Sequence, residues 1–421
     1  KYLTLKHAFV LTLGISSTIL VFSLVTSFML QEKVKRSTIV FKEETVDVAT
    51  EDVYENEGNN NAENVEDENQ TTSDEENNKT DMSTEQINNL ANELSKENSR
   101  DVENKSSETK SNGISLMLLG EIMMGGEVTE NLNYIYTSAF KNIYSITKAC
   151  DFTYANFSTN ITNLDKIEDA KSKYIVTKQV TSALKAIGLD SVSVASDHML
   201  DFSDNIFNST VNILEDSDIF VAGRKDTPVY FEKNQKKFAL ISTNAVILGT
   251  SKNYTKNDIS VYDKDNLVKN IEEAKKSSDF VIVDCHYGRE YTYGINDQMR
   301  EIAYTAIDNG ADLVIGSHAL GVYPIVKYKD KPIIYSTGYL MSDSDLNAAK
   351  EGFLYKLNVS DDLKISSIEM TPIYIDSKKE VKLYTDYNLQ KANSYLEMFN
   401  NWQVQNGLNS NIKNGKIVVE F

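Results

Sequence analysis

The chain has 421 residues, a length that suits one large domain with additional segments better than one small core. Its net charge of −19 is unevenly spread, since residues 37–112 hold 21 acidic and 6 basic side chains and residues 1–36 carry a net charge of +4. The rest carries about −8 and has no basic stripe with interleaved aromatic residues, which argues against a nucleic-acid partner.

Residues 1–36 predict a membrane anchor. Residues 8–30 contain no charged side chain, and this run is long enough for a transmembrane helix. A signal peptide has a shorter apolar core and a cleavage site, so we expect an uncleaved single-pass helix in the cell membrane. The alternative, a buried helix of a soluble core, fits less well because the run is apolar on every face. Positive charges flank both ends, so charge alone does not set the orientation.

Residues 37–112 predict an acidic, disordered stalk. The segment is rich in Glu, Asp, Asn, Ser and Thr and has few large apolar residues, so it cannot bury enough surface to offset its ordering entropy. One short helix is expected inside it, over residues 83–94, where a capping-box pattern precedes an apolar face. Alone in water such a helix is only marginally stable.

The folded domain is expected over residues 113–376, as an α/β domain in which apolar strands alternate with amphipathic helices. The patterns predict strands at 114–119, 151–155, 191–195, 219–222, 353–359 and 365–372, hairpins at 229–242 and 323–335, and helices at 178–187, 203–214 and 268–276. Residues 377–421 are expected to form a C-terminal extension that packs on the domain, with a helix at 388–402 and a strand at 417–421.

The stretch over residues 280–318 has the pattern of a strand, a helix and a second strand. Apolar runs open and close it, and apolar residues recur at helical spacing between them. The pair at 296–297 offers an N-terminal cap, and Gly310 can end the helix. In such a βαβ unit the strands are parallel, so His286 and His318 are expected just past their carboxyl ends, where α/β sheets bind ligands.

Five strands are each followed by a side chain that can ligate a metal. Three of the four histidines in the chain occupy these positions. Carboxylate, amide oxygen and imidazole together suit Mn, Fe or Zn, and such an ion can polarise a phosphoryl group or generate hydroxide. We therefore expect a shared polar site with a divalent metal, or the remnant of one, at Glu121, Asn156, His198, His286 and His318.

Neighbouring residues have both functional and structural interpretations. Asp201 and Glu290 can orient the histidines that precede them, and Arg289 can hold an anion with its guanidinium group. Equally, Asp201 can cap the following helix, and Arg289 and Glu290 can form a surface pair that contributes little. Both cysteines, Cys150 and Cys285, are expected as free thiols, with a disulfide as the alternative.

The motifs resemble those of the CapA-type capsule biosynthesis family, also called poly-γ-glutamate synthesis accessory proteins. The resemblance covers residues 113–372 and implies a metallophosphatase-like αββα sandwich, with the folded domain outside the cell. It is carried by residues 120–125 (GEIMMG), 151–158 (DFTYANFS), 195–201 (ASDHMLD), 286–291 (HYGREY), 310–320 (GADLVIGSHAL) and 335–340 (YSTGYL).

The chain departs from the family motifs at several ligand positions. Glu121 replaces an aspartate, and residues 196–197 (SD) replace a pair of asparagines. Ser158 stands where the family has glutamate, and Leu320 stands where it has a histidine. A leucine cannot ligate, so the metal site is expected to be weakened or lost unless Asp197 supplies a substitute carboxylate.

Three functions remain open on this sequence. The first is an anchored extracellular accessory protein of poly-γ-glutamate synthesis or export, whose partners are membrane subunits of the polymer synthase and the anionic polymer. The second is a metal-dependent hydrolase of the phosphoesterase type, with His198, His286, Asp197 and Arg289 as catalytic residues. The third is a surface protein that keeps the fold for adhesion or scaffolding. The domain has no obvious basic cradle for an acidic polymer, but a local groove could be lined by Lys171, Lys173 and Lys178.

Overall fold

The computed structural model describes residues 113–164, 173–225, 227–246, 259–290, 294–319 and 321–421. The predicted anchor over residues 8–30 and the predicted stalk over residues 37–112 lie outside this part of the chain. Within it, no helix combines the length and the hydrophobicity that crossing a membrane requires.

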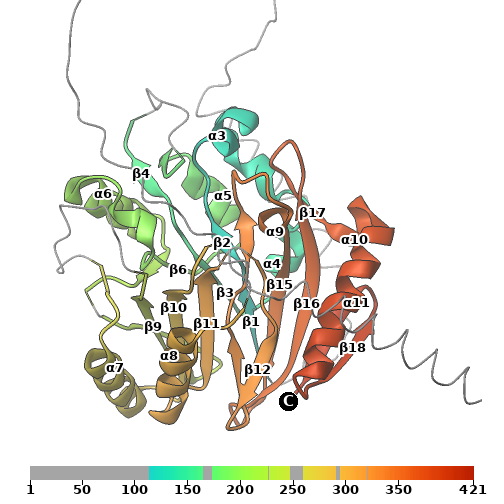
Figure 1. The fold of residues 1–421 in the computed structure, drawn as a ribbon. Helices are drawn as coiled ribbons and strands as arrows, with labels where there is room; N and C mark the ends of the chain where they lie inside the picture. The colour runs from blue at the N-terminus through green and yellow to red at the C-terminus, as the bar shows by residue number, and fades with distance from the viewer. Residues whose placement is uncertain (1–112, 165–172, 226, 247–258, 291–293, 320) are drawn as a thin grey trace, which may run out of the picture. The chain divides into compact units, whose positions relative to one another are not determined.

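A nine-stranded mixed sheet forms one half of the domain (Figure 1). Its strands lie in the order β18-β19-β16-β15-β1-β3-β6-β7, and β17 pairs with β16. The neighbours β1, β3, β6 and β7 are parallel to one another. The strands β15 to β19 pair antiparallel, and β15 also pairs antiparallel with β1. The bounds are β1 Ile114–Leu118, β3 Phe152–Asn156, β6 Ser191–Ser193, β7 Phe220–Ala222, β15 Glu351–Val359, β16 Ile365–Ile375, β17 Val381–Leu383, β18 Asn409–Lys413 and β19 Lys416–Glu420.

A six-stranded sheet forms the other half, in the order β12-β13-β11-β10-β9-β8. Its four central strands are parallel and its two edge strands are antiparallel. Two further parallel pairs, β2 with β14 and β4 with β5, lie outside both sheets. The bounds are β8 Val229–Lys233, β9 Lys236–Asn244, β10 Phe280–Tyr287, β11 Leu313–His318, β12 Ile325–Tyr328, β13 Lys331–Ile334, β2 Glu121–Ile122, β14 Tyr339–Met341, β4 Asn160–Thr162 and β5 Ile175–Thr177.

Alternation along the strands explains why the two sheets pack face to face between helices. On β10, Phe280 and Ile282 enter the core between the sheets, whereas Val281 and Val283 pack under α7 and α8. A third cluster joins the other face of the nine-stranded sheet to its covering helices. The result is the expected helix–sheet–sheet–helix order, with the helices α3 Glu127–Leu132, η1 Tyr136–Phe140, α4 Tyr144–Thr147, α5 Val180–Ala186, α6 Asp204–Glu215, α7 Lys264–Ser277 and α8 Asp297–Asp308.

The predicted βαβ unit is confirmed, with one correction. The side chain of Asn296 caps α8 by accepting a hydrogen bond of 2.9 Å from the backbone N–H of Met299, and Gly310 follows with φ of 115°. Strands β10 and β11 are parallel neighbours. However, they continue to Tyr287 and His318, so both histidines lie inside the ends of the strands rather than after them. The ladder hydrogen bonds therefore hold both histidines at fixed positions.

The C-terminal residues are part of the same packing. β19 pairs with β16, and α11 (Leu389–Gln405), which follows the short helices α9 (Asn347–Lys350) and α10 (Tyr384–Tyr387), lies beside that end of the sheet (Figure 1). Its residues Leu396 and Phe399 enter the core between the sheets. Gln403 on the same helix accepts a hydrogen bond of 2.9 Å from the backbone of Ile325 on β12. The helix therefore links the two sheets.

Truncating the buried face of α11 should destabilise the whole domain. Phe399 is 3% exposed, so Phe399→Ala is expected to lower the free energy of unfolding by about 3–5 kcal/mol. The adjacent Met398 is 41% exposed, so Met398→Ala should change it by less than about 0.5 kcal/mol. Urea unfolding of the full-length chain, followed by circular dichroism, measures both values. Equal effects of the two substitutions would contradict the linking role of α11.

Candidate functional site

The carboxylate of Asp197 lies at the centre of a cluster of three histidines. Asp197 begins the 3-10 helix η2 (Asp197–Leu200), which follows β6 of the nine-stranded sheet. Its Oδ1 atom lies 2.9 Å from Nε2 of His286. Its Oδ2 atom lies 3.6 Å from Nε2 of His198 and 3.8 Å from Nδ1 of His318. One carboxylate thus joins residues from three separate segments of the chain.

His286 enters this cluster from the six-stranded sheet. The residue is fully buried, and both of its ring nitrogens have partners. Nε2 faces Asp197, and Nδ1 lies 2.9 Å from Oγ of Ser317 on the neighbouring strand. Because His286 and Ser317 are directly paired between β10 and β11, the sheet register itself fixes the orientation of the ring.

His318 occupies a constrained backbone position. Its φ of 80° lies in the left-handed region, which residues other than glycine adopt at an energetic cost. Its backbone N–H donates a hydrogen bond of 3.1 Å to Oε2 of Glu121, and its ring lies 4.8 Å from that of His286, measured between centroids. Strain of this kind is concentrated at functional sites, where surrounding contacts hold it in place.

His198 is held from both sides. Its Nδ1 atom lies 2.9 Å from Oδ2 of Asp201, as expected for an orienting carboxylate. Its ring stacks on that of Tyr174, with centroids 3.5 Å apart and planes at 8°. The side chain of Asn160 donates a hydrogen bond of 3.0 Å to its backbone carbonyl. These contacts leave Nε2 of His198 facing Asp197.

Glu121 and Asn156 form the remaining wall of the site. Oγ of Ser158 lies 2.5 Å from Oε1 of Glu121 and 3.0 Å from Oδ1 of Asn156. Ser158 therefore occupies the place of the family glutamate with a group that binds both neighbours. Among the described residues, the Nδ2 atom of Asn156 is buried and has no hydrogen-bond partner. Buried polar atoms almost always have a partner, so this amide is an exception.

Burial and hydrogen bonding together set the charges of the cluster. Burial opposes ionisation of Asp197, but the hydrogen bond from His286 and the surrounding imidazoles outweigh it and lower the pKa of Asp197. Burial also opposes protonation of His286 and His198, yet their bonds to Asp197 and Asp201 raise the pKa of both. Burial and the charge of His286 lower the pKa of His318 to about 3, so this imidazole is neutral at pH 7.

The donor set fits one divalent cation. Asp197, His286 and His318 each offer one ligand atom, and these atoms lie within 4.8 Å of one another. A carboxylate with two imidazoles suits Mn, Fe or Zn. Binding would displace the proton of His286, so the affinity of the site for a cation should rise with pH.

The five predicted strand-end residues and Asp197 lie in this one site, while their role as metal ligands stays a prediction. The expected orienting role of Glu290 is corrected, because both ring nitrogens of His286 are taken by Asp197 and Ser317. Arg289 is exposed, and its role in holding an anion stays a prediction. Leu320 lies outside the described residues.

Several residues of the site were not expected from the sequence. Ser317 directly precedes His318, so the parallel pairing of β10 with β11 could have identified it. Tyr174 has no sequence signal that relates it to His198. Asp284 is buried two residues before His286 and accepts a hydrogen bond of 2.6 Å from Ser242, and burial raises the pKa of its carboxyl group. Cys150 and Cys285 are both free thiols, as expected, and burial raises the pKa of Cys285.

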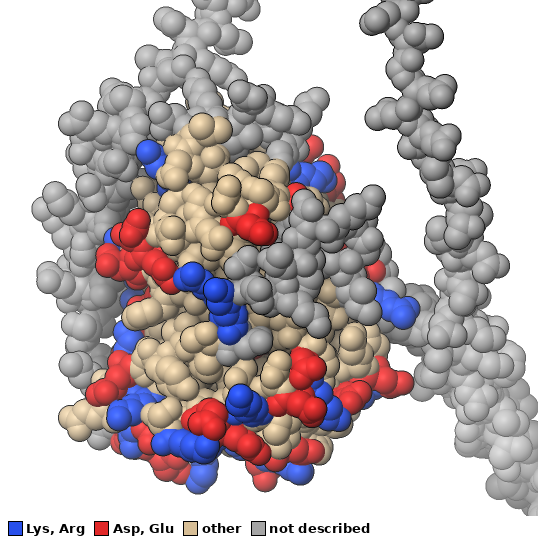
Figure 2. Space-filling model, turned by 90° about the vertical axis from the view of Figure 1, so that its left-hand side faces the viewer, with Lys and Arg blue, Asp and Glu red and all other residues tan. Residues whose placement is uncertain are grey.

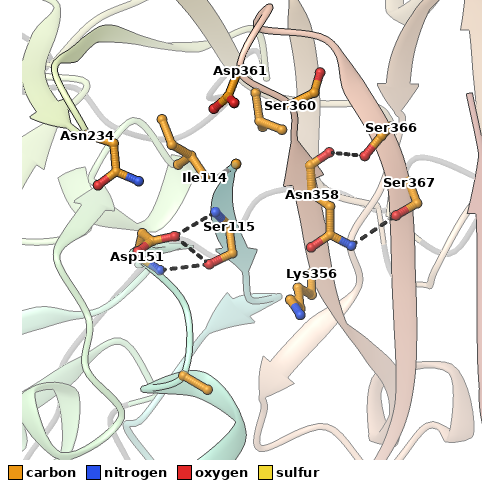
Figure 3. A pocket seen from close by; sticks show the side chains of 13 residues that line it. Ile114, Ser115, Asp151, Asn234, Lys356, Asn358, Ser360, Asp361, Ser366 and Ser367 are labelled. Atoms are coloured by element: carbon orange, nitrogen blue, oxygen red, sulfur yellow. Dashed lines mark hydrogen bonds between the residues drawn. The ribbon is translucent and has the colours of Figure 1, made fainter. Parts of the chain in front are cut away.

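A second hollow lies at the opposite end of β1 and has a volume of about 1290 Å³ (Figure 3). Its polar side chains form hydrogen bonds mainly with one another. Ser115 donates a hydrogen bond of 2.7 Å to Asp151, and Asn358 donates one of 2.9 Å to Ser367. The groups that Figure 3 joins with dashed lines are thus already satisfied, unlike the amide of Asn156.

The surface charge is mixed on the face shown in Figure 2. Basic and acidic side chains intersperse over its lower part, without a patch of one sign. Lys173, from the expected basic groove, lies 3.3 Å from Asp343. Lys171 lies outside the described residues, so the structure does not test the full groove.

The model of the family described as bacterial capsule synthesis protein PGA_cap matches residues 115–344, more than half of the chain and all of the Asp197 cluster. The chain belongs to this family. The PGA_cap match ends before α9, so the C-terminal helix and hairpin lie beyond it.

Two relatives match most of this PGA_cap chain. The PGA biosynthesis protein CapA of Bacillus subtilis (strain 168) is 26% identical over 295 residues, which span 66% of this chain and 76% of the relative. The capsule biosynthesis protein CapA of Bacillus anthracis is 26% identical over 293 residues, spanning 65% and 71%. A 5'-nucleotidase structure from Candida albicans SC5314 has 12% identity and a TM-score of 0.38 over 72% of this chain and 60% of that chain, which is too low to carry an argument.

Removing the central carboxylate should weaken cation binding. We expect Asp197→Asn to lower the affinity for Mn²⁺ or Zn²⁺ at least about tenfold, because the neutral amide is a poorer ligand and no longer balances the histidines. Isothermal titration calorimetry of the full-length chain at pH 7.5 measures the change. Asp216→Asn, at an exposed position after α6, is the matched control. Unchanged affinity in Asp197→Asn would place the cation elsewhere.

Acid should destabilise the cation-free protein through His318. Its folded pKa of about 3 lies below the unfolded value near 6.5, so the unfolded state binds more protons between these values. The free energy of unfolding should therefore fall as pH drops from 6.5 to 4, by an amount on the order of a few kcal/mol. The effect is measured by urea unfolding in chelator at several pH values.

His318→Gln should make that pH dependence shallower. His198→Gln is the control, because the raised pKa of His198 contributes stability that is complete below about pH 6.5 and is lost only as pH rises above it, so the slope between pH 4 and 6.5 should stay nearly unchanged. A slope that His318→Gln leaves unchanged would contradict the neutral state of this imidazole.

Proposed function

We propose that this chain is an accessory protein in the synthesis or export of a capsule polymer of the poly-γ-glutamate type. The observation that carries the proposal is the family match over residues 115–344. The two Bacillus relatives, whose names refer to PGA or capsule biosynthesis, support it over about two thirds of the chain. In this role the protein works through binding, with a weak cation site or none at the Asp197 cluster.

The same proposal places the folded domain outside the cell. Residues 8–30 would anchor it in the membrane, and the stalk would hold it away from the bilayer. A flexible coil of the length of residues 37–112 has an end-to-end distance on the order of 50 Å. The partners would be membrane subunits of the polymer synthase or exporter, together with the anionic polymer they deliver.

A second function is a metal-dependent hydrolase of the phosphoesterase type with a metallophosphatase-like fold. The specific observation in its favour is the cluster of the half-buried Asp197 with the buried His286 and His318, to which His198, Glu121 and Asn156 are joined. A bound divalent ion would supply Lewis-acid activation of a phosphoryl oxygen or a water.

The residues of the chain have defined tasks in such a hydrolase. Asp201 holds His198 by Nδ1 and favours its protonated form, so Nε2 of His198 could donate a proton to a leaving group. Asp197 balances the positive charge of protonated His286, and both residues would hold a bound cation. Ser158 and Leu320 stand where the family has ligating types, which favours a single ion over a pair.

The two functions predict different results in the bacterium that carries this chain. Deletion of its gene should abolish the anionic polymer at the cell surface, and the wild-type chain should restore it. His286→Ala, which removes a ligand, should restore the polymer if the protein acts by binding, and should fail if the protein acts as a hydrolase.

The readout is surface polymer measured by hydrolysis and amino-acid analysis, with the level of each variant checked by immunoblot. Glu232→Gln, an exposed position on β8, is the control for substitution as such. Normal polymer after deletion of the gene would contradict the capsule function itself.

A further inference from the structure

A pocket with a volume of about 610 Å³ lies beside the Asp197 cluster, within the range of small-molecule sites. Tyr174 belongs to both, because it lines the pocket and stacks on His198. Tyr339 lines the pocket too, and the pairing of β14 with β2 places it directly beside Glu121. The pocket and the cluster therefore adjoin each other.

Two groups in the wall make no hydrogen bond within the described residues. Tyr339 is 5% exposed, and among the described residues its hydroxyl has no hydrogen-bond partner. Glu290 is half-buried and has neither a hydrogen bond nor an ion pair within the described part of the chain. Burial and the charge of Asp197 raise the pKa of Glu290, so a positive group beside it would be stabilised.

The other buried or paired acids of the wall already have cations. Asp343 lies 3.3 Å from Lys173, and Asp345 lies 2.8 Å from Lys350. Glu127 lies 3.7 Å from the buried Nζ of Lys379. Among the described residues of the wall, only Glu290 combines partial burial with the lack of a cation, since the remaining acid, Glu130, is exposed to solvent.

Lys173 gives the same pocket a positive group at its edge. Its side chain is 58% exposed, whereas that of its partner Asp343 is 8% exposed, so Asp343 needs this cation. A lysine ammonium has three donors, so Lys173 can meet an incoming carboxylate on its exposed side while it keeps the pair with Asp343. The pocket thus offers a place for a cation and a place for an anion within one wall.

The head of an α-amino acid carries both charges, on an ammonium and a carboxylate that are bonded to the same carbon. In a glutamate chain linked through the side-chain carboxyl group, the first residue keeps both its ammonium and its α-carboxylate. In an α-linked peptide the first residue has the ammonium alone, because its α-carboxyl group forms the amide. The end of a γ-linked chain is therefore a zwitterion that an ordinary peptide does not present.

We propose that this pocket binds the zwitterionic amino terminus of a γ-linked glutamate chain, with its ammonium at Glu290 and Tyr339 and its α-carboxylate at Lys173. The following amide then lies toward the Asp197 cluster, next to Tyr174 and His198. This inference rests on the proposed capsule function and names the part of the polymer that the site recognises.

Four small probes test the assignment by isothermal titration calorimetry with the full-length chain in detergent. They are γ-glutamyl-glutamate in both enantiomeric forms, its N-acetyl derivative, α-glutamyl-glutamate, and 4-aminobutanoyl-glutamate, which lacks only the α-carboxylate. At least one enantiomer of γ-glutamyl-glutamate should bind, and the N-acetyl derivative should bind at least about tenfold more weakly because the ammonium is gone. Equal affinity for all probes, or no binding of either enantiomer, would overturn the proposal.

Isosteric variants assign the groups. Glu290→Gln and Tyr339→Phe should each weaken binding of γ-glutamyl-glutamate about five- to tenfold, whereas the exposed control Glu232→Gln should not. Lys173→Met should weaken γ-glutamyl-glutamate but leave 4-aminobutanoyl-glutamate unchanged, since that probe has no α-carboxylate to lose. Circular dichroism confirms that each variant is folded. Unchanged binding in Glu290→Gln would remove the ammonium site and overturn the proposal.

The polymer assay separates this failure from failure of the proposed function. If the wild-type chain restores surface polymer but none of the γ-linked probes binds, the pocket assignment is wrong and the capsule function stands. If the probes bind as described and deletion of the gene leaves the polymer unchanged, the pocket assignment stands and the capsule function is wrong.

Discussion

The carboxylate of Asp197 is the interaction on which the site depends. It starts from the nine-stranded sheet and reaches His286 and His318 on the six-stranded sheet, so it closes the seam between the two halves of the domain. A carboxylate among imidazoles is stable in a buried place only while the charges balance. A divalent cation can therefore replace the protons that now balance the negative charge of Asp197.

A second polar contact crosses the same seam deeper in the core. Oγ of Ser242 on β9 lies 2.6 Å from Oγ of Ser193 on β6 and 2.6 Å from the buried carboxyl group of Asp284. Buried polar networks of this kind favour one arrangement of the packed layers over others. Together with the hydrogen bond from Ile325 to Gln403 at the far edge, it sets how the two sheets face each other. The position of Asp197 relative to His286 follows from that packing.

Much of this arrangement could be predicted from the sequence, because it follows from periodicity and strand-end rules. The apolar stripe and the caps at Asn296 and Gly310 defined α8, and the βαβ rule placed β10 parallel to β11. Convergence of His286 and His318 follows from that pairing alone. The same strand-end rule grouped His198, Glu121 and Asn156 with them, and the family motifs cover the same residues.

The missed features depend on contacts between distant segments. The strands β4 and β5 have three residues each, too few for an alternation to be visible, yet Tyr174 beside them covers His198. Glu290 was expected to orient His286, but Ser317 takes that place and Glu290 faces a pocket instead. Sequence spacing gives only the position of Glu290 along the chain. The direction of its side chain depends on the turn that follows β10.

The most direct test of the central claim is anomalous diffraction from crystals of the protein soaked in Mn²⁺. The account predicts one strong peak within ligand distance of Asp197, His286 and His318, with the direct contact between Asp197 and His286 replaced by bonds to the ion. A site without a peak at saturating Mn²⁺, or a peak bound by other residues, would contradict it.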